Sequence, residues 1–154
     1  MGGLPGGAGM FRLTRRYRFS AAHRLASPYL DERSNAEIYG KCNNPAGHGH
    51  NYYVEISVAG PLHERTAQVV DRARLDHLVE TCVLSGLRHA DLNRAAPELE
   101  NLPPTTENLA GLIARRLLAA WPEFFPREQP RLDRVLVRET RRNSVELIIS
   151  DEQI

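Results

Sequence analysis

The stretch at residues 48–60 reads HGHNYYVEISVAG and predicts a β-strand with one apolar face. Successive side chains of a strand point to opposite sides, so every second residue shares a face. The apolar face carries His48, His50, Tyr52, Val54, Ile56 and Val58. The opposite face carries Asn51, Glu55 and Ser57, and the pair Gly60-Pro61 closes the strand with a turn.

Residues 11–23 predict a second strand of the same kind. Apolar residues alternate with polar ones from Phe11 to Ala21, and His23 falls on the apolar side. Two further strands are predicted near residues 132–139 and 144–150, with a hairpin around residues 141–143 between them.

Two amphipathic helices are predicted between these strand pairs. Asp71 can cap the first, and Thr105 or Thr106 can cap the second, which Pro122 is expected to stop. The order strand, strand, helix, helix, strand, strand predicts an α+β fold, in which a four-stranded antiparallel sheet carries two helices on one face. Residues 26–47 are expected to form a long loop, and long loops in compact domains tend to be functional.

Composition restricts the kinds of partner. The 154 residues carry a formal net charge of +1, which gives no reason to expect nucleic acid or an anionic membrane as a partner. No apolar run approaches the roughly 18 residues of a membrane helix. The Gly-rich residues 1–9 are expected to be a disordered leader before a single domain at residues 10–154. Two cysteines do not make a secreted disulfide framework, which favours a reducing cytoplasm.

Three histidines form a candidate metal site. His48 and His50 project from one face of their strand, and His23 ends the other strand on its apolar side. If the two strands pair, the three imidazoles converge. Three histidines with one open position are typical of catalytic zinc, whereas structural zinc usually takes four ligands and more sulfur. The alternative is that these are ordinary core or rim histidines.

Cys42 is a candidate nucleophile or base, because it lies in the polar loop and adjoins Lys41. A nearby cation or metal lowers the pKa of a thiol, and a thiolate beside zinc can abstract a proton from a substrate. The alternative is an ordinary free cysteine that packs as a small hydrophobe.

His89 and Glu139 are weaker candidates. His89 has Asp91 two residues away and could act as a general acid or base, although a surface histidine is as plausible from spacing alone. Glu139 shares the parity of Val135 and Val137 at a strand end and so is expected to point inward. A buried carboxylate needs donors, which the edge of a pterin or guanine ring would offer. A strand-end salt bridge is the equal alternative.

Several segments together resemble the 6-pyruvoyl-tetrahydropterin synthase and 6-carboxytetrahydropterin synthase family. The most specific is YGKCNNPAGHGHNY at residues 39–52. The others are FSAAHRL (19–25), VVD (69–71), residues 87–93, PTTEN (104–108) and RET (138–140). They extend over about residues 11 to 150.

This resemblance implies a tunnelling fold, assembled as homotrimers or homohexamers with active sites between subunits. It implies Zn²⁺ at His23, His48 and His50, with Cys42 as the catalytic base and His89 as its partner in proton transfer. It makes Glu139 the anchor of the pterin ring, in a pocket that Thr105, Thr106 and Glu107 line. The implied substrate is 7,8-dihydroneopterin triphosphate.

The chain departs from the family pattern at one position. The family motif is Leu-Asp-His, whereas this chain has Leu87-Arg88-His89. The aspartate normally completes a relay, and Arg88 cannot accept a proton; Asp91 is a hypothetical replacement. Arg88 would also disfavour an imidazolium at His89 if it lay close.

The first functional hypothesis is a lyase that forms 6-carboxy-5,6,7,8-tetrahydropterin, on the way to queuosine. The second is a pyruvoyl synthase that eliminates triphosphate from the same substrate. A third is a catalytically weak zinc protein that binds pterins, which Arg88 favours. A zinc hydrolase unrelated to pterins is the last alternative, and residues 105–108 and 139–140 speak against it.

Overall fold

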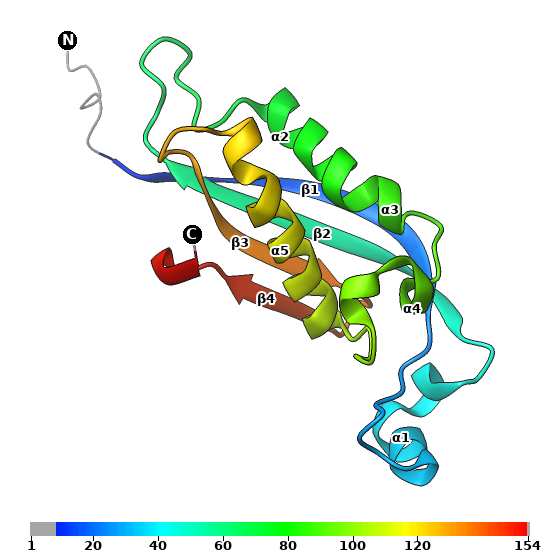
Figure 1. Cartoon of the computed structure of the whole chain (residues 1–154). Helices are drawn as coiled ribbons and strands as arrows, with labels where there is room; N and C mark the ends of the chain where they lie inside the picture. The colour runs from blue at the N-terminus through cyan, green and yellow to red at the C-terminus, as the bar shows by residue number, and fades with distance from the viewer. Residues whose placement is uncertain (1–8, 154) are drawn as a thin grey trace.

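Four strands form one antiparallel sheet in the computed structural model, which describes residues 9–153 (Figure 1). The strands are β1 (Phe11–His23), β2 (His48–Gly60), β3 (Arg131–Arg138) and β4 (Ser144–Ile148), and they are adjacent in that order. The predicted leader lies outside the described residues, apart from Gly9. The sheet and its strand order confirm the predicted strands, with ends that differ by one or two residues.

The register of β1 and β2 aligns their apolar faces. Ala21 faces His50 and His23 faces His48, so the two strands bring all three histidines to one end of the sheet. Farther along, Tyr52, Val54, Ile56 and Val58 are fully buried. The alternation in the sequence therefore continues from the core directly into the histidine cluster.

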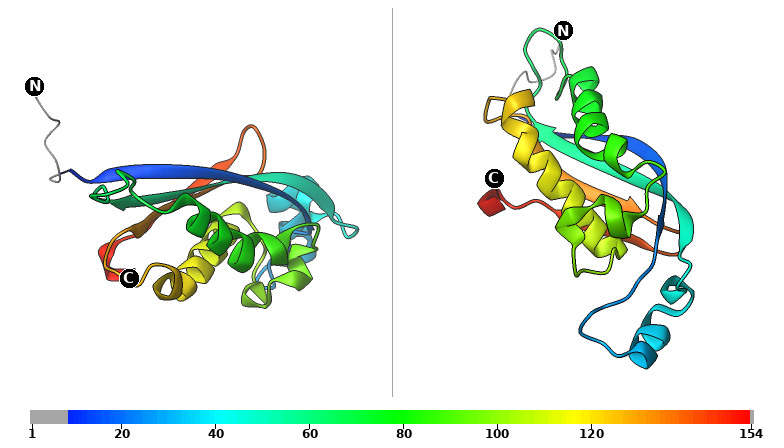
Figure 2. Two further views of the ribbon diagram at one scale, coloured as in Figure 1. Left: turned by 90° about the horizontal axis from the view of Figure 1, so that it is seen from above. Right: turned by 45° about the vertical axis from the view of Figure 1, so that its right-hand side comes forward.

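The two predicted helices cover one face of the sheet, as Figure 2 shows from above. The first is α2 (Arg72–Val79), which runs through the π-helical turn η2 (Glu80–Leu84) into α3 (Ser85–Leu87). The second is α5 (Thr106–Phe124). Asp71 and Thr105 cap them through side-chain oxygens that accept from the backbone N–H groups three residues on, as predicted. Their apolar sides include Leu75, Leu78, Leu109, Leu112, Ile113 and Leu117, all fully buried.

The sequence predictions were wrong in two places. Pro122 does not stop α5, which ends two residues later at Phe124. A proline in the last turn breaks a single backbone bond, and Phe125 beyond it still packs in the core. The expected loop at residues 26–47 contains α1 (Glu32–Tyr39) and the 3₁₀ turn η1 (Gly40–Asn43). The side chain of Asp31 caps α1, and Asn35 inside it is buried and bonds the carbonyls of Ser27 and Leu30.

Shorter elements complete the chain between the helices and at its end. They are α4 (Leu92–Ala95), η3 (Pro97–Leu99) and η4 (Asp151–Gln153). Figure 1 shows α1 at the end of the sheet where β1 finishes and β2 starts, away from α2 and α5. The described residues include no helix that is both long and apolar enough to cross a bilayer.

The face of the sheet opposite the helices is polar. Its centre is an ion-pair network in which Arg134 bonds Glu55 and Glu146, while Arg16 bonds Glu55 from β1. The two edge strands of the sheet are β1 and β4. Edge strands present unpaired backbone groups to their surroundings.

Candidate metal and catalytic site

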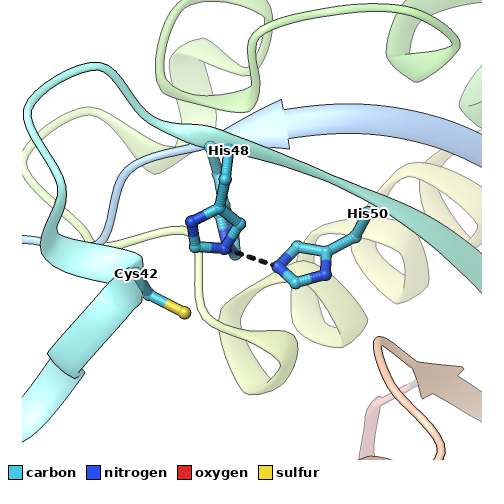
Figure 3. A group of neighbouring side chains, drawn as sticks. Cys42, His48 and His50 are labelled. Atoms are coloured by element: carbon cyan, nitrogen blue, oxygen red, sulfur yellow. Dashed lines mark hydrogen bonds between the residues drawn. The ribbon is translucent and has the colours of Figure 1, made fainter.

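The three histidines converge as the sequence predicts. The ring centroids of His23, His48 and His50 lie 4.6 to 5.0 Å apart. The Nε2 atoms of His48 and His50 are 2.7 Å apart, and this contact is the dashed line in Figure 3. Gly47 permits the chain just before His48 to pass close to the backbone of His23, because a Cβ at position 47 would lie 3.1 Å from the carbonyl oxygen of His23.

His23 is oriented by a backbone carbonyl. Its side chain is buried, and Nδ1 lies 3.2 Å from the carbonyl oxygen of Pro104, just before α5. A carbonyl oxygen only accepts, so Nδ1 carries the proton and Nε2 presents a lone pair. That Nε2 is buried and has no hydrogen-bond partner within the described residues. Such an atom is what an imidazole ligand presents to a metal ion.

The electrostatics of the cluster also suit a metal. Burial lowers the pKa of His23 to about 4, and the neighbouring His50 and His48 lower it further against the Pro104 hydrogen bond. Burial likewise lowers the pKa of His50, although the charge of Glu139 opposes the effect. Metal binding needs neutral imidazoles, and the lowered pKa values of His23 and His50 favour that form of these two rings.

Cys42 joins this cluster from η1, and Figure 3 shows its sulfur directed into the space beside the rings of His48 and His50. The ligand atoms of Cys42 and the three histidines all lie within 4.8 Å of one another. The carbonyl of Cys42 accepts from the N–H of Leu25, and the Asn43 side chain bonds the Leu25 carbonyl, which ties η1 to the chain just after His23. Nitrogen and thiolate donors of this kind fit zinc.

The expected effect of Lys41 on Cys42 is not found. Burial raises the pKa of the Cys42 thiol, the charge of Glu139 raises it further, and Lys41 is not among the causes. Lys41 is exposed on the turn, so solvent screens its charge from the thiol. A metal ion is thus the cation that could favour the thiolate here.

Glu139 points inward, as predicted, and faces the histidines. Its Oε1 lies 3.5 Å from the Nε2 atoms of both His23 and His50, and its side chain is 9% exposed. This oxygen is buried and has no hydrogen-bond donor among the described residues. A buried carboxylate oxygen without a donor is costly, so the site is suited to a ligand that brings N–H groups.

The predicted pocket residues begin next to the same site. Thr105 caps α5 directly after Pro104, whose carbonyl holds His23. Thr106 is buried, whereas Glu107 is exposed. The start of α5 therefore lies against the histidine cluster, with Glu107 turned toward solvent.

His89 and Asp91 are not among the clustered ligand atoms, although Asp91 forms a β-bridge with Ala22 beside His23 and its charge raises the pKa of His23 against the larger effect of burial. His89 has a left-handed backbone with φ of 58°, and its N–H bonds the carbonyl of Ser20 at the edge of β1. Together with Arg18, Ser20, Asn51 and Tyr53, it lines a hollow of about 340 Å³ that does not include Cys42. The Asp91 side chain caps α4 by accepting from the N–H of Asn93, and its Oδ2 lies 3.7 Å from Nε of Arg94.

Arg88, the residue before His89, is paired with a carboxylate. Its guanidinium forms two hydrogen bonds, of 2.8 and 2.9 Å, with the carboxylate of Glu80 in η2. The pair is partly exposed, and each charge compensates the other. The positive charge of Arg88 is therefore balanced by the carboxylate of Glu80.

The sequence analysis missed two contributors to the site, which are the Pro104 carbonyl and the side chain of Tyr52. Tyr52 is fully buried, and its hydroxyl lies 3.1 Å from Nδ1 of His23. The inward position of Tyr52 was predictable, because it shares one face of the strand with His48 and His50. Nothing in the sequence indicated that the Pro104 backbone reaches the site.

Comparison with known proteins decides the family. Residues 12–148 match the family model described as 6-pyruvoyl tetrahydropterin synthase. The chain belongs to this family. Relatives named 6-pyruvoyl tetrahydrobiopterin synthase include one from Poecilia reticulata, which is 39% identical over 86% of each chain. One from Drosophila melanogaster is 50% identical over 66% of this chain and 60% of its own length.

Solved structures confirm the fold of the 6-pyruvoyl tetrahydropterin synthase family. The Caenorhabditis elegans 6-pyruvoyl tetrahydropterin synthase superposes with a TM-score of 0.82 at 30% identity, covering 94% of this chain and 99% of that one. The Plasmodium vivax enzyme of the same name has a TM-score of 0.65 at 15% identity and supports the fold alone, covering 91% and 98% of the chains. The α+β tunnelling fold implied by the sequence resemblance is thus confirmed.

Proposed function

We propose that this protein is a zinc-dependent 6-pyruvoyl tetrahydropterin synthase that eliminates triphosphate from 7,8-dihydroneopterin triphosphate. The observation that carries the proposal is the buried Oε1 of Glu139, which lacks a donor and faces the imidazoles of His23 and His50. The names of the relatives favour the pyruvoyl product over the carboxy product, which the sequence analysis had placed first. Both products start from the same substrate.

The proposed metal ligands are His23, His48 and His50. When bound, Zn²⁺ supplies a Lewis acid that polarises oxygen atoms of the substrate side chain. The chain contributes three imidazoles, and the Pro104 carbonyl fixes the tautomer of the His23 ring. The unpartnered Nε2 of His23 supports this assignment.

Cys42 is the proposed base. Its thiol lies beside the histidines rather than in a core position, so it can reach a substrate held there. Glu139 is the proposed acceptor for N–H groups of the pterin ring, and Thr105, Thr106 and Glu107 are the proposed remainder of that pocket. A carboxylate that accepts two N–H bonds from a planar ring edge gives both affinity and orientation.

His89 is proposed to act between subunits, with Asp91 as its nearest carboxylate in sequence. Within one chain His89 opens into a hollow that excludes Cys42, so a complete relay needs a second copy. A homotrimer or homohexamer would supply it, and the edge strands β1 and β4 offer backbone groups for such assembly.

The deciding experiment is product analysis. Zinc-loaded protein is incubated with 7,8-dihydroneopterin triphosphate, and the products are identified by mass spectrometry. A pyruvoylpterin with inorganic triphosphate supports the proposal. A carboxypterin with acetaldehyde replaces it by the queuosine-pathway activity, and tight pterin binding without any product replaces it by a binding function, which Arg88 in place of aspartate would then explain.

A further inference from the structure

The side chain of Tyr52 lies at the base of the histidine cluster but takes no part in the function proposed above. Its ring is stacked on Phe19 at a centroid distance of 5.2 Å and is fully buried. The ring also meets the edges of His23 and His50 at 6.3 and 5.7 Å. A buried phenol normally has a hydrogen-bond partner for its hydroxyl, so the atoms nearest the Tyr52 hydroxyl indicate the role of this side chain.

The hydroxyl of Tyr52 is directed to the non-ligating side of His23. The phenol oxygen lies 3.1 Å from Nδ1, and the carbonyl oxygen of Pro104 lies 3.2 Å from the same atom. An Nδ1 atom without a proton would direct its own lone pair at the lone pairs of the Pro104 carbonyl oxygen, which is repulsive. The proton is therefore on Nδ1, and it is shared between two acceptors, the carbonyl and the phenol oxygen.

The opposite nitrogen of the His23 ring faces Glu139. Oε1 of this carboxylate lies 3.5 Å from Nε2 of His23 and has no hydrogen-bond donor among the described residues. Nε2 is itself buried without a hydrogen-bond partner there. With the proton on Nδ1, the lone pair of Nε2 is directed into the space that a metal ion would occupy.

We propose that Tyr52 is a positioning residue of the metal centre, whose hydroxyl accepts the Nδ1–H of His23 together with the Pro104 carbonyl. It thereby orients the lone pair of His23 Nε2 toward the metal. Outer hydrogen bonds of this kind fix the tautomer and ring orientation of a ligating histidine and raise its basicity. The inference rests on the proposed metal site but not on the identity of the substrate.

The test is the zinc affinity of Tyr52→Phe, which removes only the hydroxyl and keeps the stacking on Phe19. We expect the Kd for Zn²⁺, measured by competition with a chromophoric chelator, to rise by about 10- to 100-fold. The visible spectrum of the Co²⁺-loaded protein should change as well. The matched control is Tyr17→Phe, which removes a hydroxyl that donates to Asp76 outside the cluster and should leave both readouts unchanged.

An unchanged Kd and Co²⁺ spectrum in folded Tyr52→Phe would overturn the inference, even if the variant melted at a lower temperature. If that variant does not fold, NMR of the metal-free wild type decides. The His23 ring should carry its proton on Nδ1 and show an NOE from that proton to the Tyr52 ring, and a proton on Nε2 refutes the inference. If the protein binds zinc through His23 but converts no pterin, the proposed function is refuted, whereas the inference about Tyr52 is not.

Discussion

The Nε2 atoms of His48 and His50 face each other at 2.7 Å across one face of β2. Two ring nitrogens this close need a proton between them, and a metal ion that both nitrogens ligate can take its place. We therefore expect His48→Ala to lose stoichiometric zinc, measured by elemental analysis after dialysis against a weak chelator. His77→Ala, which changes an exposed histidine packed on Phe124, should keep its zinc. Full zinc content in His48→Ala would refute the site.

Replacement of Cys42 distinguishes between two roles of this residue, as a general base or as a ligand of the metal. Because general base catalysis contributes about 10²- to 10⁴-fold, Cys42→Ala should lose turnover by that order while it keeps one zinc per chain. Cys82→Ala, at a thiol packed beside the helical core, is the control and should keep both. If Cys42→Ala loses its zinc, the thiol is a fourth ligand and the base must be another group.

His89 lines a hollow to which Cys42 of the same chain does not contribute, and the proposed role of both residues in one site predicts complementation between subunits. Cys42→Ala and His89→Ala should each be inactive alone. After the two are mixed, unfolded and refolded together, about a quarter of sites should hold both native residues if subunits pair at random. Steady-state turnover of the mixture measures this recovery. Activity that stays at the level of the separate variants would place both residues in the site of one chain or remove His89 from the reaction.

The ion pair of Glu98 and Arg116 predicts a pH-dependent contribution to stability. Two hydrogen bonds from Arg116, of 2.7 and 2.9 Å, lower the pKa of Glu98 to about 2, from an ordinary value near 4.5. A lowered pKa stabilises the fold above about pH 4.5, and the contribution is lost as the pH falls toward 2. Since Glu98 is 38% exposed, solvent screening reduces the effect to about 1 kcal/mol.

We expect Glu98→Gln to lower the free energy of unfolding by that amount at pH 7, measured by urea titration. The difference from the wild type should shrink across the window from pH 4.5 to 2. A difference that does not depend on pH would show that the carboxylate contributes by packing rather than by charge.

Two glycines should respond to alanine in opposite directions. Gly47 has φ of 71°, and a Cβ there would press on the His23 carbonyl, so Gly47→Ala should lower the free energy of unfolding by about 1–2 kcal/mol. Gly111 lies within α5 with open space around its Cα, so Gly111→Ala should raise it by about 0.5–1 kcal/mol. Urea unfolding of the metal-free proteins measures both, and an equal response would contradict this explanation.

Alternation of side chains made the sheet and the histidine cluster predictable. A strand has only two faces, so parity alone assigned His23, His48, His50 and Glu139 to the buried side. The helix caps at Asp71 and Thr105 were predictable for a similar reason, because short polar side chains before an apolar pattern satisfy free N–H groups.

Features that depend on contacts between distant segments were not predictable. The helix α1 is short and contains few apolar residues, and its buried residue Asn35 bonds the carbonyls of the segment before the helix. Arg88 pairs with Glu80, which lies eight residues earlier at the start of the π-helical turn η2, and no pattern in the sequence indicated this turn. The contact between the Pro104 backbone and His23 joins positions 81 residues apart, and no local pattern contains it.

That contact also sets an order of events in folding. The cluster needs His23 from β1, His48 and His50 from β2, the Pro104 carbonyl before α5 and Glu139 after β3. Such distant segments meet only after most of the chain has found its register, because the loops between them must close first. We therefore expect uptake of the proposed metal ion to be a late step, because a newly made chain has to reach its native topology before these ligands meet.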